Sequence, residues 1–379
     1  MPSFTQEIDR IVHSGISHLI IDIEKGVDVA YMVSACAAAS APAAHHFVSN
    51  TTQPAASVAP SPVVLGEELD RAARVREEAL GFVKTMMEDA RYGRLPELEK
   101  TSQVVQNIVD SIASSPDAFL AMLQIKDIDN YTFLHSVSVC ALMAAFCRSL
   151  DFPADVTFQA SLGGLIHDIG KAMVPPEILN KPGRLTDEEY EIVKRHAADG
   201  HAMLSRIPGI GVVPLNITLC HHERLDGSGY PSAFTDGAIS ELAQMAAIVD
   251  VYDVITADRP NHLGMPPALA LAILYEWSST QYSRHYVEAF IRCLGIFPSG
   301  SLVLLGSGRL GVVAEQNSAD MRAPMVNKCE FAVLHFATRR QTQKPYEHAA
   351  WRHNRQHRRS KEMEAKTRKV SCNQVRSTA

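Results

Sequence analysis

The feature that most constrains this chain is a series of five histidine and aspartate clusters within a long helical region. The clusters are His135, the pair His167 and Asp168, His196, the pair His221 and His222, and Asp250. Successive clusters lie 25 to 32 residues apart, which is about one helix with its connection and return. This spacing predicts that the five clusters meet at one level of a helical bundle.

His167 and Asp168 lie side by side in the otherwise apolar stretch GLIHDIGKAMVPPEIL. Burying a polar side chain without a partner costs about 2–7 kcal/mol. A helix end could satisfy the pair, but a bound cation would satisfy all five clusters together. Imidazole with carboxylate suits Fe, Mn or Zn, and one carboxylate among several histidines is the arrangement that bridges two metal ions. The clusters therefore predict a metal centre.

From Leu98 to about Leu294 the sequence predicts one helix after another. Thr186 opens one helix with Glu189 three residues later, which is a capping box, and another helix is expected to begin at Ser240. Neither strand alternation nor a glycine-rich phosphate loop is present. After Gly295, short β-branched runs between glycine turns predict a hairpin. The expected fold is mainly α, a helical bundle with a small β-hairpin appendage.

Three segments are expected before the bundle. Residues 1–30 predict a short α/β fragment of one helix and one strand, which cannot bury a core alone. Residues 31–66 are rich in Ala, Pro and Ser and predict a disordered linker. Residues 67–100 predict a connecting amphipathic helix whose apolar face carries Leu80, Val83, Met87 and Ala90. This helix could form a homodimer, lead a signal into the bundle, or pack on its own domain.

The net charge of −6 is unevenly distributed. Residues 318–379 hold 14 Lys and Arg against 5 Asp and Glu, which predicts a basic and mostly disordered tail. The rest of the chain is acidic, so we expect no specific nucleic-acid binding. The longest uncharged run, between Asp28 and Glu67, contains four prolines and predicts no membrane span. Seven unpatterned cysteines are typical of reduced thiols and indicate a cytoplasmic protein.

The motifs around the clusters resemble those of a known family. HDIGK, with a histidine before it and an aspartate after it, is similar to the HD phosphohydrolase superfamily. HHERLDGSGYP narrows the resemblance to the HD-GYP family, the bacterial phosphodiesterases of cyclic di-GMP. The resemblance covers roughly Asp129 to Glu315 and implies an HD-GYP domain at 101–317 with an HD-type helical bundle. Residues 8–29 and the helix after the linker resemble a truncated form of the accessory segment that often precedes this domain.

The resemblance also implies a ligand set for two divalent metal ions. The implied ligands are His135, His167, Asp168, His196, His221, His222 and Asp250. Some members bind a third metal through a glutamate at the place of Tyr131, whose presence here implies only two. Fe or Mn is the expected metal, with Zn, Ni or Mg as alternatives. Asp168 is the implied bridging catalytic carboxylate, and Lys171 matches a family lysine near the scissile phosphate.

For the substrate, the resemblance implies contacts from Lys171, Gly229, Tyr230, Pro231, Arg259 and His262. Tyr230 could stack on guanine or anchor its loop, and the sequence leaves both interpretations open. Arg259 matches the family, but Asn261 and His262 replace an aromatic–basic pair. Because histidine contributes less phosphate affinity at pH 7 than lysine or arginine, weaker substrate binding is expected.

The implied function is metal-dependent hydrolysis of cyclic di-GMP to linear pGpG in bacterial signal transduction. The resemblance leaves open whether cleavage continues to GMP. The alternative is a catalytically weak cyclic di-GMP-binding or protein-interaction module that serves other signalling proteins. The truncated N-terminal segment, the change at Asn261 and His262, and the unusual tail favour this alternative, whereas the complete ligand set favours the enzyme. A general HD nucleotide phosphohydrolase lacks the Gly-Tyr-Pro loop and is disfavoured.

Overall fold

The computed structural model describes residues 62–125, 130–181, 183–258, 264–278, 280–305, 310–317 and 320–328. All of these residues belong to one compact unit. The fragment expected at 1–30, most of the linker and most of the basic tail lie outside the described residues. The described residues are mainly helical and end in a small antiparallel sheet, which confirms the predicted fold class.

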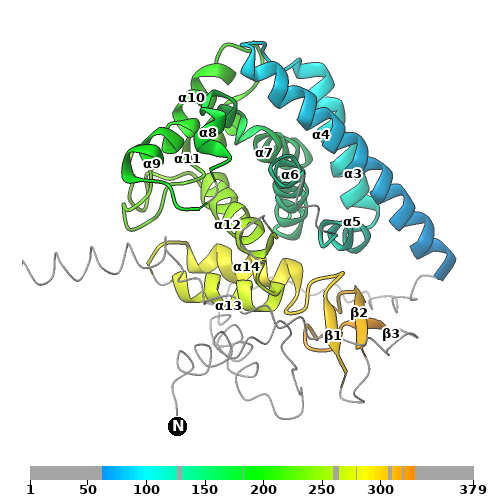
Figure 1. Ribbon diagram of the computed structural model, residues 1–379. Helices are drawn as coiled ribbons and strands as arrows, with labels where there is room; N and C mark the ends of the chain where they lie inside the picture. Colours follow the sequence, from blue (N-terminus) through cyan, green and yellow to red (C-terminus); the bar gives the residue numbers. More distant parts are fainter. Residues whose placement is uncertain are drawn as a thin grey trace, which may run out of the picture. The chain divides into compact units, whose positions relative to one another are not determined.

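The helices follow one another along the chain and are labelled in Figure 1. They are α3 (Pro62–Arg91), α4 (Leu98–Ser114), α5 (Pro116–Leu123), α6 (Tyr131–Ser149), α7 (Ala154–Ile166), the 3-10 helix η1 (Ile169–Met173), α8 (Pro176–Leu179), α9 (Asp187–Lys194), α10 (His196–Leu204), α11 (Val212–Cys220), α12 (Glu241–Thr256), α13 (Pro267–Trp277) and α14 (Arg284–Leu294).

Helix α6 is the centre of the bundle (Figure 1). Every residue from Leu134 to Cys147 is buried, because α7, α12, α4, α3 and α14 all pack against it. A helix that is apolar all round is typical of a core position. The same helix is long and apolar enough to cross a membrane by composition, but 78% of that window is buried inside the structure. Its burial brings His135, near its first turn, into the interior.

The predicted connecting helix is α3, and it packs on its own domain. Its expected apolar face is buried, with Val83 and Ala90 at 0% exposure, and it joins the same hydrophobic core as α6. The predicted boundaries were wrong at both ends. The helix begins at Pro62, within the expected linker, and it stops at Arg91 before a turn in which Gly93 has a φ of +76°. Positive φ favours glycine and ends a helix, so α4 is a separate element.

The predicted starts of α9 and α12 are confirmed. Thr186 accepts a hydrogen bond from the Glu189 backbone N–H at 3.2 Å, and the Glu189 carboxylate accepts from the Thr186 N–H at 2.7 Å. Ser240 accepts from the Ala243 N–H at 3.3 Å. Each contact satisfies N–H groups that a helix start leaves without a partner. Helix α9 directly precedes His196, and α12 carries Asp250. The capping residues therefore help to set where these two side chains enter the bundle.

The predicted hairpin is larger than expected. Strand β1 (Leu302–Leu304) pairs with β2 (Leu310–Glu315), and β2 pairs on its other side with β3 (Met325–Lys328), giving the order β1-β2-β3. Strand β3 therefore comes from the tail expected after 317. A third strand pairs the second edge of β2 and covers Val313, which is 1% exposed.

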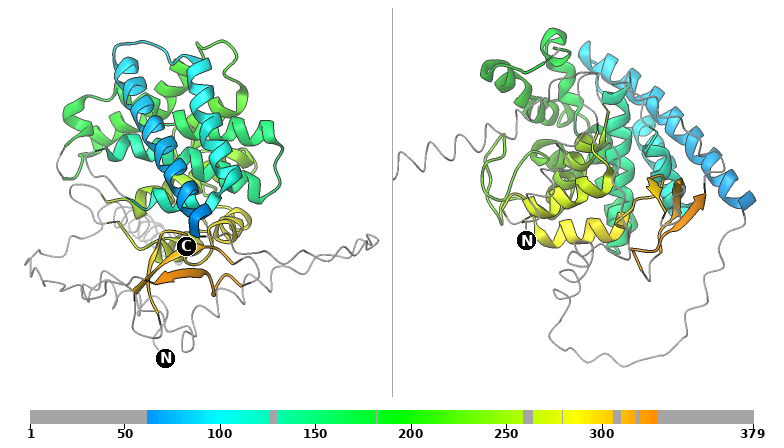
Figure 2. Two further views of the ribbon diagram at one scale, coloured as in Figure 1. Left: turned by 90° about the vertical axis from the view of Figure 1, so that its right-hand side faces the viewer. Right: turned by 60° about the horizontal axis from the view of Figure 1, so that its bottom comes forward.

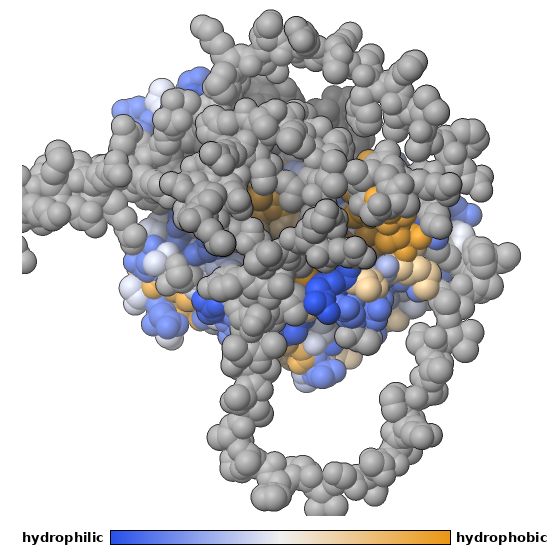
Figure 3. Space-filling model, turned by 90° about the horizontal axis from the view of Figure 1, so that it is seen from below, coloured by the Kyte–Doolittle hydropathy of each residue, from blue (hydrophilic) through white to orange (hydrophobic). Residues whose placement is uncertain are grey.

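The sheet lies beside one end of the helical bundle in both views of Figure 2, and β2 packs against α5. Its link to the bundle is partly polar, since Ser299 donates a hydrogen bond to Asp117 in the first turn of α5. Viewed from below, the described surface mixes hydrophobic and hydrophilic residues (Figure 3). Leu302 and Met325 of the sheet are 44% and 43% exposed.

Candidate metal centre

The five clusters are placed by helix ends and by two core helices. His135 lies near the start of α6, and Asp250 lies within α12. His167 directly follows α7, and Asp168 directly precedes η1. These two neighbouring residues therefore place two ligand types where the chain turns. His196 begins α10, and His221 and His222 follow α11. Side chains at helix ends can converge from several directions, which explains the regular spacing along the chain.

All seven side chains predicted from the spacing come together. They form two groups that could each hold a metal ion, one of Asp168, His196, His221 and His222 and the other of His135, His167 and Asp250. Within each group one ligand atom per residue lies within 4.8 Å of the others. Six of the residues are 1–3% exposed, and only the His222 side chain, at 23%, reaches solvent.

Asp168 faces both groups with different oxygens. Its Oδ1 lies 3.3 Å from His196 Nε2 and 3.8 Å from His221 Nε2. Its Oδ2 lies 3.5 Å from His135 Nε2 and 3.3 Å from His167 Nε2. Metal–ligand bonds of about 2.0–2.2 Å put neighbouring ligand atoms roughly 3–3.5 Å apart, so the distances to His135, His167 and His196 match the edges of a coordination shell. The arrangement is that of a carboxylate able to bridge two cations.

The imidazoles are oriented by hydrogen bonds on their outer side. His167 Nδ1 lies 2.8 Å from the Gly164 carbonyl, His196 Nδ1 lies 2.7 Å from that of Val193, and His221 Nδ1 lies 2.9 Å from that of Thr218. A carbonyl only accepts, so each Nδ1 carries the hydrogen and donates it outward. The Nε2 lone pair is then directed into the centre, which is the tautomer that binds a metal.

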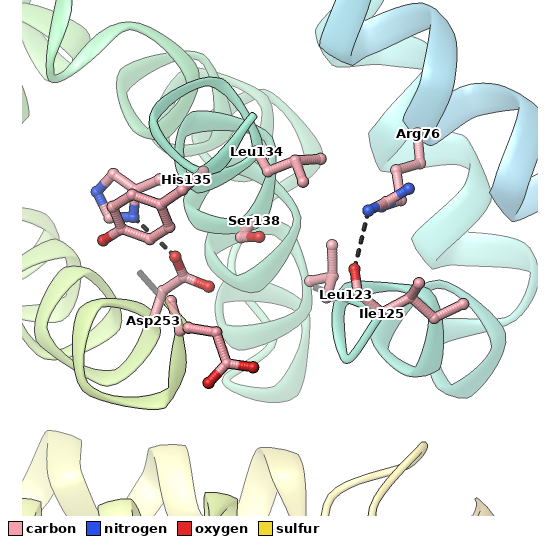
Figure 4. Close-up of a pocket in the computed structure, with 10 residues that line it drawn as sticks. Arg76, Leu123, Ile125, Leu134, His135, Ser138 and Asp253 are labelled. Atoms are coloured by element: carbon pink, nitrogen blue, oxygen red, sulfur yellow. Dashed lines mark hydrogen bonds and ion pairs between the residues drawn. The ribbon is translucent and has the colours of Figure 1, made fainter. Parts of the chain in front are cut away.

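His135 has a carboxylate in the same outer position. Its Nδ1 lies 2.8 Å from Asp253 Oδ2, and both side chains are buried. His135 and Asp253 both line a small cavity of about 20 Å³, and Figure 4 shows Arg76 of α3 across from them. The sequence reasoning missed Asp253. The available signal was its position three residues after Asp250, which places both carboxylates on one face of α12.

The residues present fit a cation. Asp168 Oδ1 is buried and accepts no hydrogen bond from any residue that the structure describes. The Nε2 atoms of His135 and His167 face each other at 3.3 Å, as do those of His196 and His221. A buried acceptor without a donor is costly, and a divalent cation bound by Asp168 and the converging Nε2 atoms would compensate it. Imidazole and carboxylate ligands suit Fe, Mn or Zn.

The pKa values show how strongly these groups interact without a metal. Burial would raise the pKa of Asp168, but His167 and Lys171 outweigh it and hold that pKa well below its ordinary value. Burial would likewise lower the pKa of His167, yet Asp168 raises it to about 10. Burial lowers the pKa of His222 to about 3. The centre therefore keeps its carboxylates charged and balances them with a proton that a cation can replace.

Close backbone contact holds η1 against α10. A Cβ added at Gly170 would lie 2.0 Å from the His196 carbonyl oxygen and 2.6 Å from the Gly200 nitrogen. Gly200 is close-packed as well, since a Cβ added there would lie 3.1 Å from both Gly170 N and Thr218 Cγ2. Only glycine allows this approach, which brings Asp168 beside His196. Gly200 is thus a packing position between η1 and α11.

A family model described as an HD domain matches residues 105–285, and a domain of unknown function matches residues 5–101. A cyclic di-GMP phosphodiesterase of Pseudomonas aeruginosa, PA4108, is 40% identical over 320 residues, which cover 84% of this chain and 75% of that protein. The chain belongs to the HD-domain family. Its motifs resemble those of the HD-GYP branch.

Other matches are shorter or concern the fold alone. The 3'3'-cGAMP-specific phosphodiesterase 1 of Vibrio cholerae is 39% identical over 144 residues, which are 37% of this chain and 33% of that one. The solved structure of Bd1817, an HDG"Y"P protein from Bdellovibrio bacteriovorus, matches with a TM-score of 0.50 and 20% identity, covering 59% of this chain and 71% of that one. It supports the HD-GYP fold.

The loop that gives the HD-GYP family its name follows His222. A Cβ at Gly229 would lie 2.5 Å from both Arg224 N and Glu223 Cα, so Gly229 is required for the loop to fold back. Buried Glu223 accepts hydrogen bonds from the Ser232 N–H at 2.7 Å and from the Phe234 N–H at 3.0 Å. Glu223 is a second residue that sequence reasoning missed, and it anchors the loop beside the centre.

Tyr230 and Pro231 lie at the tip of this loop, with a cis peptide bond between them. The Tyr230 ring lies 4.6 Å from that of His222 at an angle of 34°. Lys171 forms a salt bridge to Asp168 Oδ2. Of the six residues predicted to contact substrate, Lys171, Gly229, Tyr230 and Pro231 thus lie at the HD-GYP centre or in its loop. Arg259 and His262 lie outside the described residues.

Proposed function

We propose that this HD-GYP chain is a metal-dependent phosphodiesterase that hydrolyses cyclic di-GMP. The observation that carries the proposal is the pair of ligand groups joined by Asp168, whose two oxygens face different groups. The name of the Pseudomonas aeruginosa relative supports cyclic di-GMP as the substrate. Linear pGpG is the expected product, with GMP as a second product if cleavage continues.

The proposed metal ligands are the seven side chains predicted from the sequence. Asp168 would serve both divalent cations, His196, His221 and His222 would hold one of them, and His135, His167 and Asp250 would hold the other. Bound Fe or Mn would supply Lewis acidity and an ionised water at neutral pH. Tyr131 supports two ions rather than three, because its ring is stacked at 5.9 Å on that of His135 where the family's glutamate would stand.

The remaining proposed roles belong to residues around the opening. Lys171 is 22% exposed and holds its ammonium at Asp168, so it is placed to neutralise a phosphate oxygen during cleavage. Gly229, Tyr230 and Pro231 shape the loop over His222. Arg259 and His262 are proposed as phosphate contacts on the basis of the family resemblance.

The test is metal analysis of the purified protein, followed by a cyclic di-GMP turnover assay of the wild type and Asp168→Ala. Because one carboxylate serves both ions, its removal should empty both metal sites. The variant is therefore expected to lose both metals and all turnover. Asp155→Ala, at an exposed aspartate in the first turn of α7, is the matched control and should keep both.

Two metals per chain in Asp168→Ala would contradict the bridging role. A wild-type protein that binds cyclic di-GMP and holds two metals without turnover would contradict the enzyme and leave a binding module.

A further inference from the structure

An aromatic and cationic cluster lies beside the opening of the metal centre. It consists of Tyr190 and Lys194 of α9 and Tyr230 of the loop. The two tyrosine rings meet edge to face, 6.4 Å apart at 82°. The Lys194 ammonium lies 5.0 Å from the ring centre of Tyr190 and 5.9 Å from that of Tyr230. Lysine over two aromatic rings is a cation–π arrangement.

The cluster reaches the centre through Tyr230. The Tyr230 ring lies 4.6 Å from His222 and 6.3 Å from His196. His222 is 23% exposed, whereas the side chains of the other six predicted ligands are at most 5% exposed. Access from solvent to the centre is therefore on the His222 side. A substrate whose phosphate reaches the centre from that side passes Tyr230, with Tyr190 next to it.

Packing does not explain why Tyr190 is here. Helix α9 contributes no buried residue to the described core, and Tyr190 remains 45% exposed. Among the residues that the structure describes, Lys194 forms an ion pair only with Glu191, and such an i,i+3 surface pair contributes little stability. An aromatic ring that presents its surface to solvent beside a cationic donor is typical of a recognition site.

We propose that Tyr190 and Lys194 form a guanine subsite, in which Tyr190 stacks on one base of the cyclic dinucleotide and Lys194 donates to its edge. The inference rests on the proposed function. Stacking on an aromatic ring accepts any base. Lys194 adds discrimination, because the O6 and N7 atoms of guanine are both acceptors, whereas adenine places an amino donor beside its N7. The subsite therefore favours guanine.

The experiment measures equilibrium binding to the manganese-loaded protein. GMP and ribose 5-phosphate share a phosphate and a sugar, so the ratio of their dissociation constants isolates the base. Tyr190→Ala is expected to reduce this ratio about tenfold through loss of stacking. Tyr190→Phe should keep it, and Tyr92→Ala, at a tyrosine that is 77% exposed on the turn after α3, is the matched surface control. Lys194→Met should reduce the preference for GMP over AMP about tenfold.

If Tyr190→Ala weakened the binding of GMP and ribose 5-phosphate equally, Tyr190 would support the metal centre and would not contact a base. This result would overturn the subsite. Unchanged binding in that variant, or a wild type that binds both ligands equally, would overturn it as well. Turnover of cyclic di-GMP by the wild type is measured separately. A base-dependent ratio without turnover would contradict the proposed function while leaving the subsite in place.

Discussion

At the scale of single residues, Asp253 is the least expected participant in the centre. Its carboxylate holds the Nδ1–H of His135 at 2.8 Å and makes Nε2 a better ligand. Asp253→Asn keeps the size of the side chain but removes the charge. We expect metal affinity to fall roughly 10- to 100-fold, measured by competition with a chelating dye. Asp155→Asn is the exposed control, and unchanged affinity in Asp253→Asn would contradict the role.

A second prediction for single residues concerns the proton held by His167. The pKa of His167 is raised to about 10 in the metal-free protein, so this imidazole should still be protonated at pH 8. An ordinary histidine, with a pKa near 6.5, would be neutral there. Nitrogen-15 spectra of the metal-free protein should show the imidazolium at pH 8. It should disappear when metal is added, and also in Asp168→Ala, which removes the main charge that raises the pKa. Fully neutral imidazoles at pH 8 in the wild type would refute this.

At the scale of elements, the contact of η1 with α10 is the most sensitive joint. Gly170→Ala would bring a methyl group within 2.0 Å of the His196 carbonyl and force the two elements apart. We expect a loss of about 1–3 kcal/mol in the free energy of unfolding, measured by denaturant titration, with weaker metal binding.

Gly81→Ala is the matched control for this substitution. Gly81 lies within α3 with nothing within 4 Å of the added methyl group, so the same change should stabilise by about 0.5–1 kcal/mol. Equal effects at both positions would show that the joint between η1 and α10 is not tightly packed.

The sequence predicted elements wherever a local signal was strong. The capping box at Thr186 and the apolar face of α3 are examples, because both depend on residues a few positions apart. Helix ends were less predictable. Nothing near Pro62 distinguishes a linker from a first turn, since proline suits both. Strand β3 could not be predicted, because MVNK has no alternation and is held by pairing with β2.

At the scale of the whole molecule, some residues of the site could be predicted from the sequence and others depend on how the helices pack. The seven clustered side chains were predictable because a bundle brings residues one helix apart to one level. Asp253 and Glu223 were not, because their roles depend on which way a side chain points after the helices have packed. Asp253 meets a histidine 118 positions away, and Glu223 meets backbone N–H groups 9 and 11 positions on. The i+3 spacing places Asp253 on the same face of α12 as Asp250, but it does not predict which partner either Asp253 or Glu223 meets.

The last prediction concerns the contribution of β3 to the stability of the domain. Removing residues after Asn317 would take away β3 and leave the Gly311–Glu315 edge of β2 without its partner. It would also expose Val313, now 1% exposed, and an open edge promotes association between chains. A chain that ends at Asn317 should therefore melt at a lower temperature, by roughly 2–4 °C for each kcal/mol lost, and scatter more light. A chain that ends at Lys328 keeps β3 and should melt like the full-length protein. If both truncations melted alike, β3 would add nothing to the stability of the domain, which would support the boundary expected at 317.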